Sequence, residues 1–259
     1  MLTNFHTHTF RCGHAQGTPA DYVAQAIRDN ADCLGFSDHC PFPHDEIDTW
    51  SEIRMSPEEM PSYLEDVRRA AKTAPFPVYA GFECEWSSRY ASWYTDVLLG
   101  EQGAEYLILG AHWLSRGRKN VYAPRLADAD SIRDYFSQTL EGIGSGLFRI
   151  LAHPELIMAD GLGWNRELAA GFADIIDAAM AQNMPLEING YGLIKPPVQT
   201  AQGMRLQYPV DEFWRLAAQK GAKVICNSDA HTPDYVMRGA VNARNYAAKF
   251  SLDVVETIF

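Results

Sequence analysis

Histidine and acidic residues gather in this sequence at positions where they could bind metal ions. The segment NFHTHTFRCGHAQGT, residues 4–18, holds three of the eight histidines within nine positions. Side chains of the same chemical kind recur along the chain: Asp38, His39, Glu83, Glu85, His112, His153, Glu155, Asn189, Asp229 and His231. Imidazole and carboxylate groups bind zinc, and they also suit manganese or iron. We therefore expect a metal centre built from residues far apart in the sequence.

These residues follow short apolar segments that have the composition of buried β-strands. Seven such segments lie at residues 2–5, 33–37, 78–82, 106–111, 148–152, 185–189 and 223–227. Residues two apart in a strand point to the same side, so His6 and His8 can face one space, as can Asp229 and His231. Active sites of α/β barrels lie at the carboxyl ends of the strands. The pattern therefore predicts one shared site at that end of a barrel.

Segments with helical periodicity separate the strands, at residues 18–30, 56–72, 131–143, 165–182 and 210–221. Thr18 with Pro19, and Ser56 with Pro57, are helix-start signals, and Gly221 is a stop signal. Strands that alternate with helices predict a parallel sheet, and seven such units favour closure into a barrel. No linker divides the chain, so we expect a single domain over residues 1–259.

Composition excludes several classes of partner. The formal net charge of −11 and the lack of a clustered basic face argue against a nucleic-acid polymer. No apolar run reaches the roughly 18 residues of a membrane span, and no secretory signal precedes the first strand. The five cysteines are odd in number and scattered, which fits a reducing, cytoplasmic setting. A small substrate is expected, and the sequence does not indicate an oligomeric state.

The motifs at the strand ends resemble those of the PHP (polymerase and histidinol phosphatase) family. The matching motifs are HTH, SDH, AHW, AHPE and SDAH, together with Glu83 on the third strand. Within the family, FRCGHAQGT, GFSDHCPF, IRM, LEING and YP are similar to the histidinol-phosphate phosphatases of the HisJ type. The resemblance runs from residue 4 to about residue 236. It implies a distorted (β/α)7 barrel with a metal site at the C-terminal ends of the strands.

The resemblance also implies a site with three divalent metal ions, zinc or manganese, with iron as a further option. The implied ligands are His6, His8, Glu83 and Asp229 for the first ion, Glu83, His112 and His153 for the second, and His14, His39 and His231 for the third. The implied reaction is hydrolysis of L-histidinol phosphate to L-histidinol and phosphate, a step of histidine biosynthesis. A hydroxide that bridges two ions is the expected nucleophile. Glu83, Asp229 and His231 would be catalytic by holding these ions.

Substrate contacts are expected from the loops around this site. Arg116 is the first candidate for binding the phosphate group, because its planar fork suits phosphoryl oxygens, and Arg54 is the second. Glu155, Asn189 and Tyr191 are candidate contacts of the leaving group. The long loops at residues 40–56 and 189–209 are expected to carry such contacts, and the first contains Asp45, Glu46, Asp48 and Glu52, which could receive an ammonium group.

Other interpretations remain open at this point. The barrel could hydrolyse another small phosphate or a nucleotide, or it could be a metal-binding or regulatory module without catalytic activity. GIGSG, residues 142–146, precedes a strand, so we interpret it as a helix end and not as a dinucleotide motif. His44 is expected to be a surface residue, and the tryptophans Trp86 and Trp113 are expected to line the rim of the site.

Overall fold

Eight parallel strands form the centre of the fold in the computed structural model, which describes residues 1–259. In sheet order they are β1 (Thr3–Asn4), β2 (Cys33–His39), β3 (Val78–Cys84), β4 (Tyr106–Gly110), β7 (Ile150–Ala152), β8 (Leu186–Asn189), β11 (Lys223–Asn227) and β12 (Asp253–Val254). The first seven correspond to the seven predicted segments. β12 was not predicted, because a two-residue strand has too little periodicity to be recognised.

The segments that follow β1 and β11 meet each other at the C-terminal end of the sheet. Thr7 and Ala230 form a parallel β-bridge, and the amide of His8 donates to the carbonyl of Ala230 at 3.0 Å. β12 pairs with the opposite, N-terminal end of β11, at Lys223 and Val224. The sheet therefore closes only near its C-terminal end. This confirms the predicted distorted α/β barrel and adds one strand to it.

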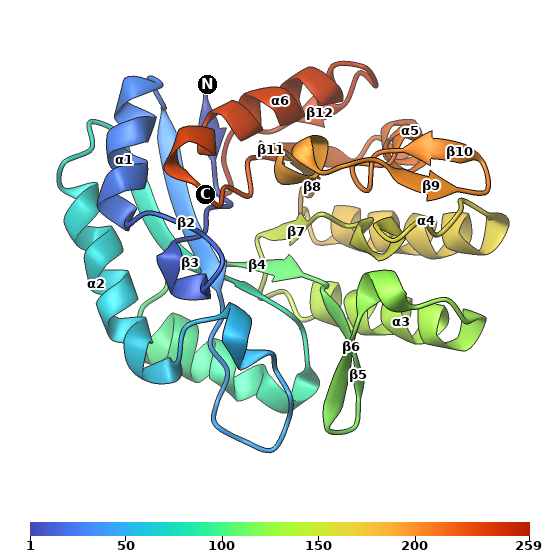
Figure 1. Ribbon diagram of the computed structural model, residues 1–259, viewed down its shortest axis with the longest axis horizontal. Coiled ribbons are helices and arrows are strands. Elements are labelled where there is room, and N and C mark those ends of the chain that lie inside the picture. Colours follow the sequence, from blue (N-terminus) through green and yellow to red (C-terminus); the bar gives the residue numbers. More distant parts are fainter.

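Helices surround the sheet, with α1 and α2 on one side and α3, α4 and α5 on the other (Figure 1). Their bounds are α1 (Pro19–Arg28), α2 (Met60–Ala71), α3 (Ala129–Gly144), α4 (Arg166–Ala181), α5 (Asp211–Lys220) and α6 (Arg238–Ala247). A π-helix at Trp93–Glu101 lies between β3 and β4 in the sequence. The five predicted helices are present, whereas the π-helix and α6 were not predicted.

The predicted helix boundaries have the expected local chemistry. Thr18 and Asp21 form a reciprocal capping box at the start of α1. Ser56 and Pro57 open a 3₁₀ turn that runs into α2. Gly221 ends α5 in the left-handed conformation, at φ 74°. No helix combines the length and the apolar composition needed to cross a lipid bilayer.

Two β-hairpins extend the loops that follow β4 and β8. The first pairs β5 (Trp113–Arg116) with β6 (Lys119–Tyr122), and the second pairs β9 (Val198–Thr200) with β10 (Gly203–Arg205).

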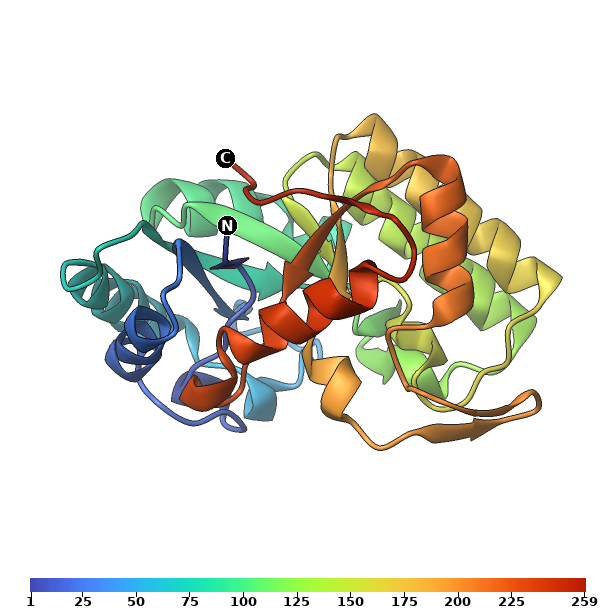
Figure 2. The same ribbon diagram turned by 90° about the horizontal axis from the view of Figure 1, so that it is seen from above.

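Trp86 and Trp113 are both buried in the core, so the expectation that they line the rim was wrong. At the end of the barrel where the strands begin, the C-terminal segment of the chain lies beside the first strand (Figure 2). There the Phe259 ring stacks on the Tyr79 ring, with 4.1 Å between the ring centroids.

Candidate metal centre

The nine predicted metal ligands converge at the C-terminal ends of the strands. Their positions follow from the chain: His6 and His8 after β1, His14 after the 3₁₀ turn Phe10–Cys12, His39 ending β2, Glu83 in β3, His112 after β4, His153 after β7, and Asp229 and His231 after β11. Eight of the nine line a cavity of about 210 Å³. The ninth, His6, is fully buried beneath it. The structure therefore brings these nine residues together, and their binding of metal ions stays a prediction.

The pair His14 and His231 shows that this assembly fits a cation. Each ring directs Nδ1 at a backbone carbonyl, His14 at Cys12 (2.8 Å) and His231 at Asp229 (3.0 Å). A carbonyl only accepts, so both Nδ1 atoms carry the proton. Burial lowers the pKa of both rings, that of His231 to about 3, which keeps them neutral. The two Nε2 lone pairs then face each other at 3.0 Å, an arrangement that a shared cation stabilises.

Glu83 joins two groups of histidines through its two carboxylate oxygens. Oε1 lies 2.9 Å from Nε2 of His153 and 3.4 Å from Nε2 of His112. Oε2 lies 3.1 Å from His39 Nδ1, and His6 and His8 are 3.4 and 3.5 Å away. Oε2 is buried without a hydrogen-bond partner, as is Asp229 Oδ1. Glu83 would therefore supply an oxygen to each group if metal ions were bound there.

The pKa shifts of the clustered side chains reflect the negative charge of the carboxylates that converge there. Burial alone would raise the pKa of Glu83, but His112 and His6 hold it well below its usual range. Burial alone would lower the pKa of His8, but the nearby carboxylates of Asp229 and Asp38 raise it to about 9. Protons on histidine thus balance the converging carboxylates. Divalent cations would balance the same charge and leave the rings neutral, as metal ligands must be.

A second layer of side chains fixes the orientation of the ligands. Glu187 Oε1 accepts from His6 Nδ1 at 2.8 Å, and Glu187 Oε2 accepts from the amide of His153. Glu85 Oε1 accepts from His112 Nδ1 at 2.9 Å. Glu187 was not predicted, although a carboxylate within the buried strand segment LEIN is the signal that could have identified it.

Two ligands also have unusual backbone conformations. His153 and Asp229 have φ angles of 27° and 51°, in the region that non-glycine residues rarely adopt. Such outliers concentrate where surrounding structure holds a functional side chain in place. His153 directly follows β7 and Asp229 lies two residues after β11, and both side chains line the cavity.

The family model of the PHP domain matches residues 4–190 of the chain. The chain belongs to the PHP family. The "Probable histidinol-phosphatase" of Deinococcus radiodurans is 28% identical to this PHP protein over 242 residues, which are 91% of this chain and 88% of the relative.

Two solved structures have the same fold as this PHP protein. A candidate histidinol phosphatase of Listeria monocytogenes superposes with a TM-score of 0.73 at 19% identity, covering 92% of this chain and 98% of its own. The histidinol phosphate phosphatase of Lactococcus lactis subsp. lactis, solved with zinc, L-histidinol and phosphate, gives a TM-score of 0.70 at 15% identity, covering 99% of this chain and 96% of its own. At these identities the two likenesses concern the fold.

The two predicted arginines do not face the cavity of the PHP centre. Arg116 ends β5, where its exposed guanidinium pairs with Asp134 at 2.9 Å and donates to Ser131. Arg54 is buried and forms a two-pronged ion pair with Glu85, the partner of His112. The structure therefore gives no support to Arg116 as a phosphate ligand, and Arg54 contacts the carboxylate partner of His112 instead of lining the cavity.

Of the candidate leaving-group contacts, only Tyr191 lines the cavity, where its ring stacks on His231 at 4.7 Å. Asn189 is buried and donates to Asp229 Oδ2 at 3.1 Å, so it positions a ligand. Glu155 is buried and accepts from the amide of Val210 and from Trp214 Nε1. Both were expected to touch substrate, and burial prevents this.

The acidic residues expected to receive an ammonium group also lie away from the cavity. None of the four lines it, and Asp45 instead accepts from Arg89 and Tyr90. His44 is a surface residue as predicted, with 72% of its side chain exposed beside Glu58.

Lys195 is the cationic residue of the cavity wall that the sequence analysis missed. It is half-buried, and its ammonium lies over the rings of Tyr191 (4.7 Å) and Tyr208 (5.3 Å). Burial lowers its pKa from the ordinary lysine value. Trp50 and Tyr122 complete an aromatic wall. The signal available in the sequence was the position of Lys195 in the long loop after the sixth predicted strand.

Proposed function

We propose that this PHP-family phosphoesterase hydrolyses L-histidinol phosphate to L-histidinol and phosphate. The observation that carries the proposal is a cavity of about 210 Å³ that combines the histidine and carboxylate cluster with one lysine and aromatic walls. Its volume suits a small phosphomonoester. The relative from Deinococcus radiodurans carries the name of the same activity.

We assign the ligands to three ions, zinc or manganese, with iron suited to the same donors. The sets are His6, His8, Glu83 and Asp229; Glu83, His112 and His153; and His14, His39 and His231. His39 also lies close to the first set, because its ring is 4.4 Å from that of His8 between centroids. When bound, such ions supply Lewis acidity and lower the pKa of bound water toward about 7.

The protein side chains would bind and orient the substrate. The Lys195 ammonium would bind a phosphoryl oxygen, in the role first expected of Arg116, and its depressed pKa reflects a burial that an anion would offset. The aromatic wall of Trp50, Tyr122 and Tyr208 offers stacking surface to the imidazole and ring faces to the ammonium of histidinol. Glu85, Glu187 and Asn189 would hold the ligands in place during turnover.

Steady-state kinetics on the metal-loaded protein tests the substrate. We expect kcat/KM for L-histidinol phosphate to exceed that for p-nitrophenyl phosphate and AMP by roughly tenfold or more, because stacking contacts add to the shared phosphate chemistry. Equal values for all three would reject the histidinol assignment and leave a general phosphoesterase. Absence of turnover with all three, at full metal content, would favour a module without catalytic activity.

Replacement of Lys195 tests the phosphate contact. Lys195→Ala should lower kcat/KM by about 10-fold or more for every phosphomonoester, because a hydrogen bond to a charged group is lost from the part that all substrates share. Arg116→Ala is the matched control and should stay within about twofold of the unmodified protein, since Arg116 pairs with Asp134 on the surface. A loss of kcat/KM in Arg116→Ala, with Lys195→Ala unchanged, would indicate Arg116 as the phosphate ligand.

A further inference from the structure

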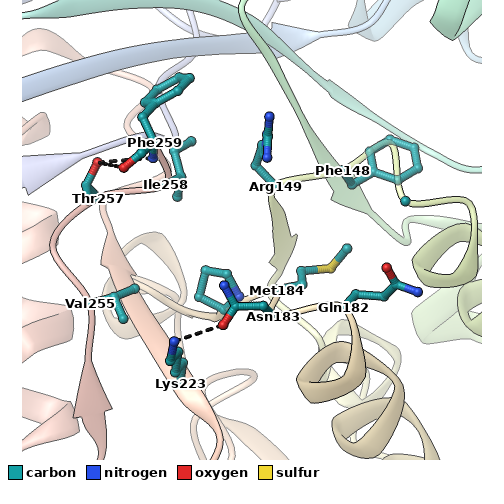
Figure 3. Close-up of a pocket in the computed structure, with 12 residues that line it drawn as sticks. Phe148, Arg149, Gln182, Asn183, Met184, Lys223, Val255, Thr257, Ile258 and Phe259 are labelled. Atoms are coloured by element: carbon teal, nitrogen blue, oxygen red, sulfur yellow. Dashed lines mark hydrogen bonds between the residues drawn. The ribbon is translucent and has the colours of Figure 1, made fainter.

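A second cavity, of about 450 Å³, lies at the N-terminal end of the barrel, opposite the metal centre (Figure 3). Residues that lead into three neighbouring strands form one side of it: Arg149 before β7, Asn183 before β8, and Lys223 at the start of β11. The C-terminal segment, including Val255 and Ile258, forms the other side. None of the proposed metal ligands takes part, so this cavity is separate from the site described above.

Two cationic side chains of the cavity have no aspartate or glutamate partner. The Arg149 guanidinium has no hydrogen-bond or ion-pair partner in the structure, and Lys223 Nζ donates only to the neutral Asn183 Oδ1 at 2.8 Å. No aspartate or glutamate lines the cavity. This contrasts with a chain of formal net charge −11. Such a local field attracts anions.

Apolar side chains form one part of the remaining lining, and the polar side chains of Gln182 and Thr257 form another. Figure 3 shows Arg149 between Phe148 on one side and Ile258 on the other, with Lys223 and Asn183 farther along the wall. Phe148 and Met184 are almost fully buried and present a fixed apolar surface. A ligand that matches this lining has an anionic oxygen group attached to a compact apolar body.

The C-terminal wall is held in place by several independent contacts. Backbone pairing joins β12 to β11, and the amide of Val255 donates to the carbonyl of Val224 at 2.8 Å. Glu256 accepts two hydrogen bonds from Arg244, both at 2.7 Å. The Phe259 ring stacks on Tyr79. The cavity is therefore already formed, which reduces the ordering cost of binding.

We propose that this cavity is a binding site for a small amphipathic anion, with Arg149 and Lys223 binding the anionic oxygens and the apolar wall covering the body of the ligand. Its volume lies in the range of small-molecule sites. The proposal is independent of the substrate assigned to the metal centre, because the two cavities share no residue.

Calorimetric titration of the metal-loaded protein with 3-phenylpropionate and with inorganic phosphate tests the site. We expect saturable one-site binding of 3-phenylpropionate, and weaker binding of phosphate, which lacks the apolar body. Arg149→Ala and Lys223→Ala should each weaken 3-phenylpropionate binding about 10-fold or more. Arg166→Ala, which removes an exposed arginine outside the cavity, is the charge-matched control and should leave binding unchanged.

Kinetics separates this cavity from the metal centre. Under saturating 3-phenylpropionate, the KM for p-nitrophenyl phosphate should stay within about twofold in the unmodified protein, since the anion does not occupy the substrate cavity. No saturable binding, unchanged binding in Arg149→Ala, or competitive inhibition would each overturn the proposal. Thermal unfolding of the variants checks that they are folded, and Arg149→Lys, which keeps the charge, should retain more affinity than Arg149→Ala.

Discussion

Glu83 occupies the point where the two histidine groups of the metal centre meet. Glu83→Gln keeps the shape of the side chain but removes its charge and one of its two ligand oxygens. Because a bridging carboxylate holds two ions and offsets their repulsion, we expect metal content to fall by at least one ion per chain. Phosphatase activity should fall by about 100-fold or more. Elemental analysis and kinetics on the same preparation measure both effects.

His44→Ala is the control for this variant. Its ring is exposed and its neighbour is Glu58, so metal content and activity should remain those of the unmodified protein. Unchanged metal content in Glu83→Gln would show that the centre is not bridged at this residue.

Glu155 gives a prediction about stability and pH. Burial raises its pKa to about 7, and Oε2 has no hydrogen-bond partner. In the unfolded chain the group ionises near its ordinary value of 4.5, so unfolding releases a proton at intermediate pH and native stability falls as pH rises from about 4.5 to 7. Glu155→Gln is neutral throughout and keeps an acceptor for Trp214. Between pH 4.5 and pH 8, its free energy of unfolding should therefore gain about 3 kcal/mol relative to the unmodified protein.

Urea unfolding of both proteins at several pH values measures this difference. A difference that is constant across the range would show that Glu155 is not the group responsible.

The residues that the sequence placed correctly differ in kind from those that it misplaced. His6 and His8 lie on an extended segment, where alternation alone determines that both point toward the candidate metal centre. Arg116 and Lys195 lie on loops after strands, where no periodicity sets the direction of a side chain. In the structure, pairing of β5 with β6 brings Arg116 to Asp134 on α3, while Lys195 lies over Tyr191. Only tertiary structure distinguishes the two cations.

At the scale of elements, the buried parallel strands were predictable because each is a continuous apolar run bounded by polar residues. α6 was missed because RGAVNARNYA has small residues on its buried face, including Gly239, Ala240 and Ala243. The π-helix Trp93–Glu101 was missed because its spacing follows neither the helical nor the strand period. These elements depend on the packing around them more than on their own pattern.

The β9–β10 hairpin belongs to the loop that also carries Tyr191 and Lys195. Hydrogen bonds from Arg205 fix the position of this hairpin. The guanidinium of Arg205 donates to the carbonyls of Leu206, Gln207, Met158 and Leu162, and so ties the hairpin to the loop after β7. Arg205→Ala should lower the free energy of unfolding by about 2 kcal/mol, because these carbonyls lose a charged donor. The loosened loop should raise KM severalfold and leave metal content unchanged.

The neighbouring Met204→Ala is the matched control, because 60% of Met204 is exposed and its loss should affect neither quantity. A fall in metal content in Arg205→Ala, with KM unchanged, would contradict the proposed effect of this hairpin on the loop that carries Tyr191 and Lys195.

At the scale of the whole molecule, the barrel closes at a seam between the segments of β1 and β11. β1 is two residues long, and the β-pairing of its segment with the β11 edge is the bridge between Thr7 and Ala230. Beside this bridge, the amides of Phe5 and Ser228 donate to the side chains of Asn227 and Asn4. The proposed ligands lie on both sides of this seam, His6 and His8 on one and Asp229 and His231 on the other. His8 Nε2 lies 3.0 Å from Asp229 Oδ1. Bound ions would therefore cross-link the two edges of the sheet and close the barrel.

Removal of the metal ions should accordingly weaken this seam more than the rest of the barrel. Protein purified without chelator should hold more than two transition-metal ions per chain, and a value near one would contradict the three-ion assignment.

Chelation should lower the Tm by roughly 10 °C or more, since binding energy to the native state is lost. Hydrogen exchange should accelerate first at the amides of His8 and Ala230, which bond across the seam, whereas Phe36, between β1 and β3, should exchange at its original rate. Uniform acceleration across the sheet would show that the ions stabilise the barrel as a whole and do not specifically close it.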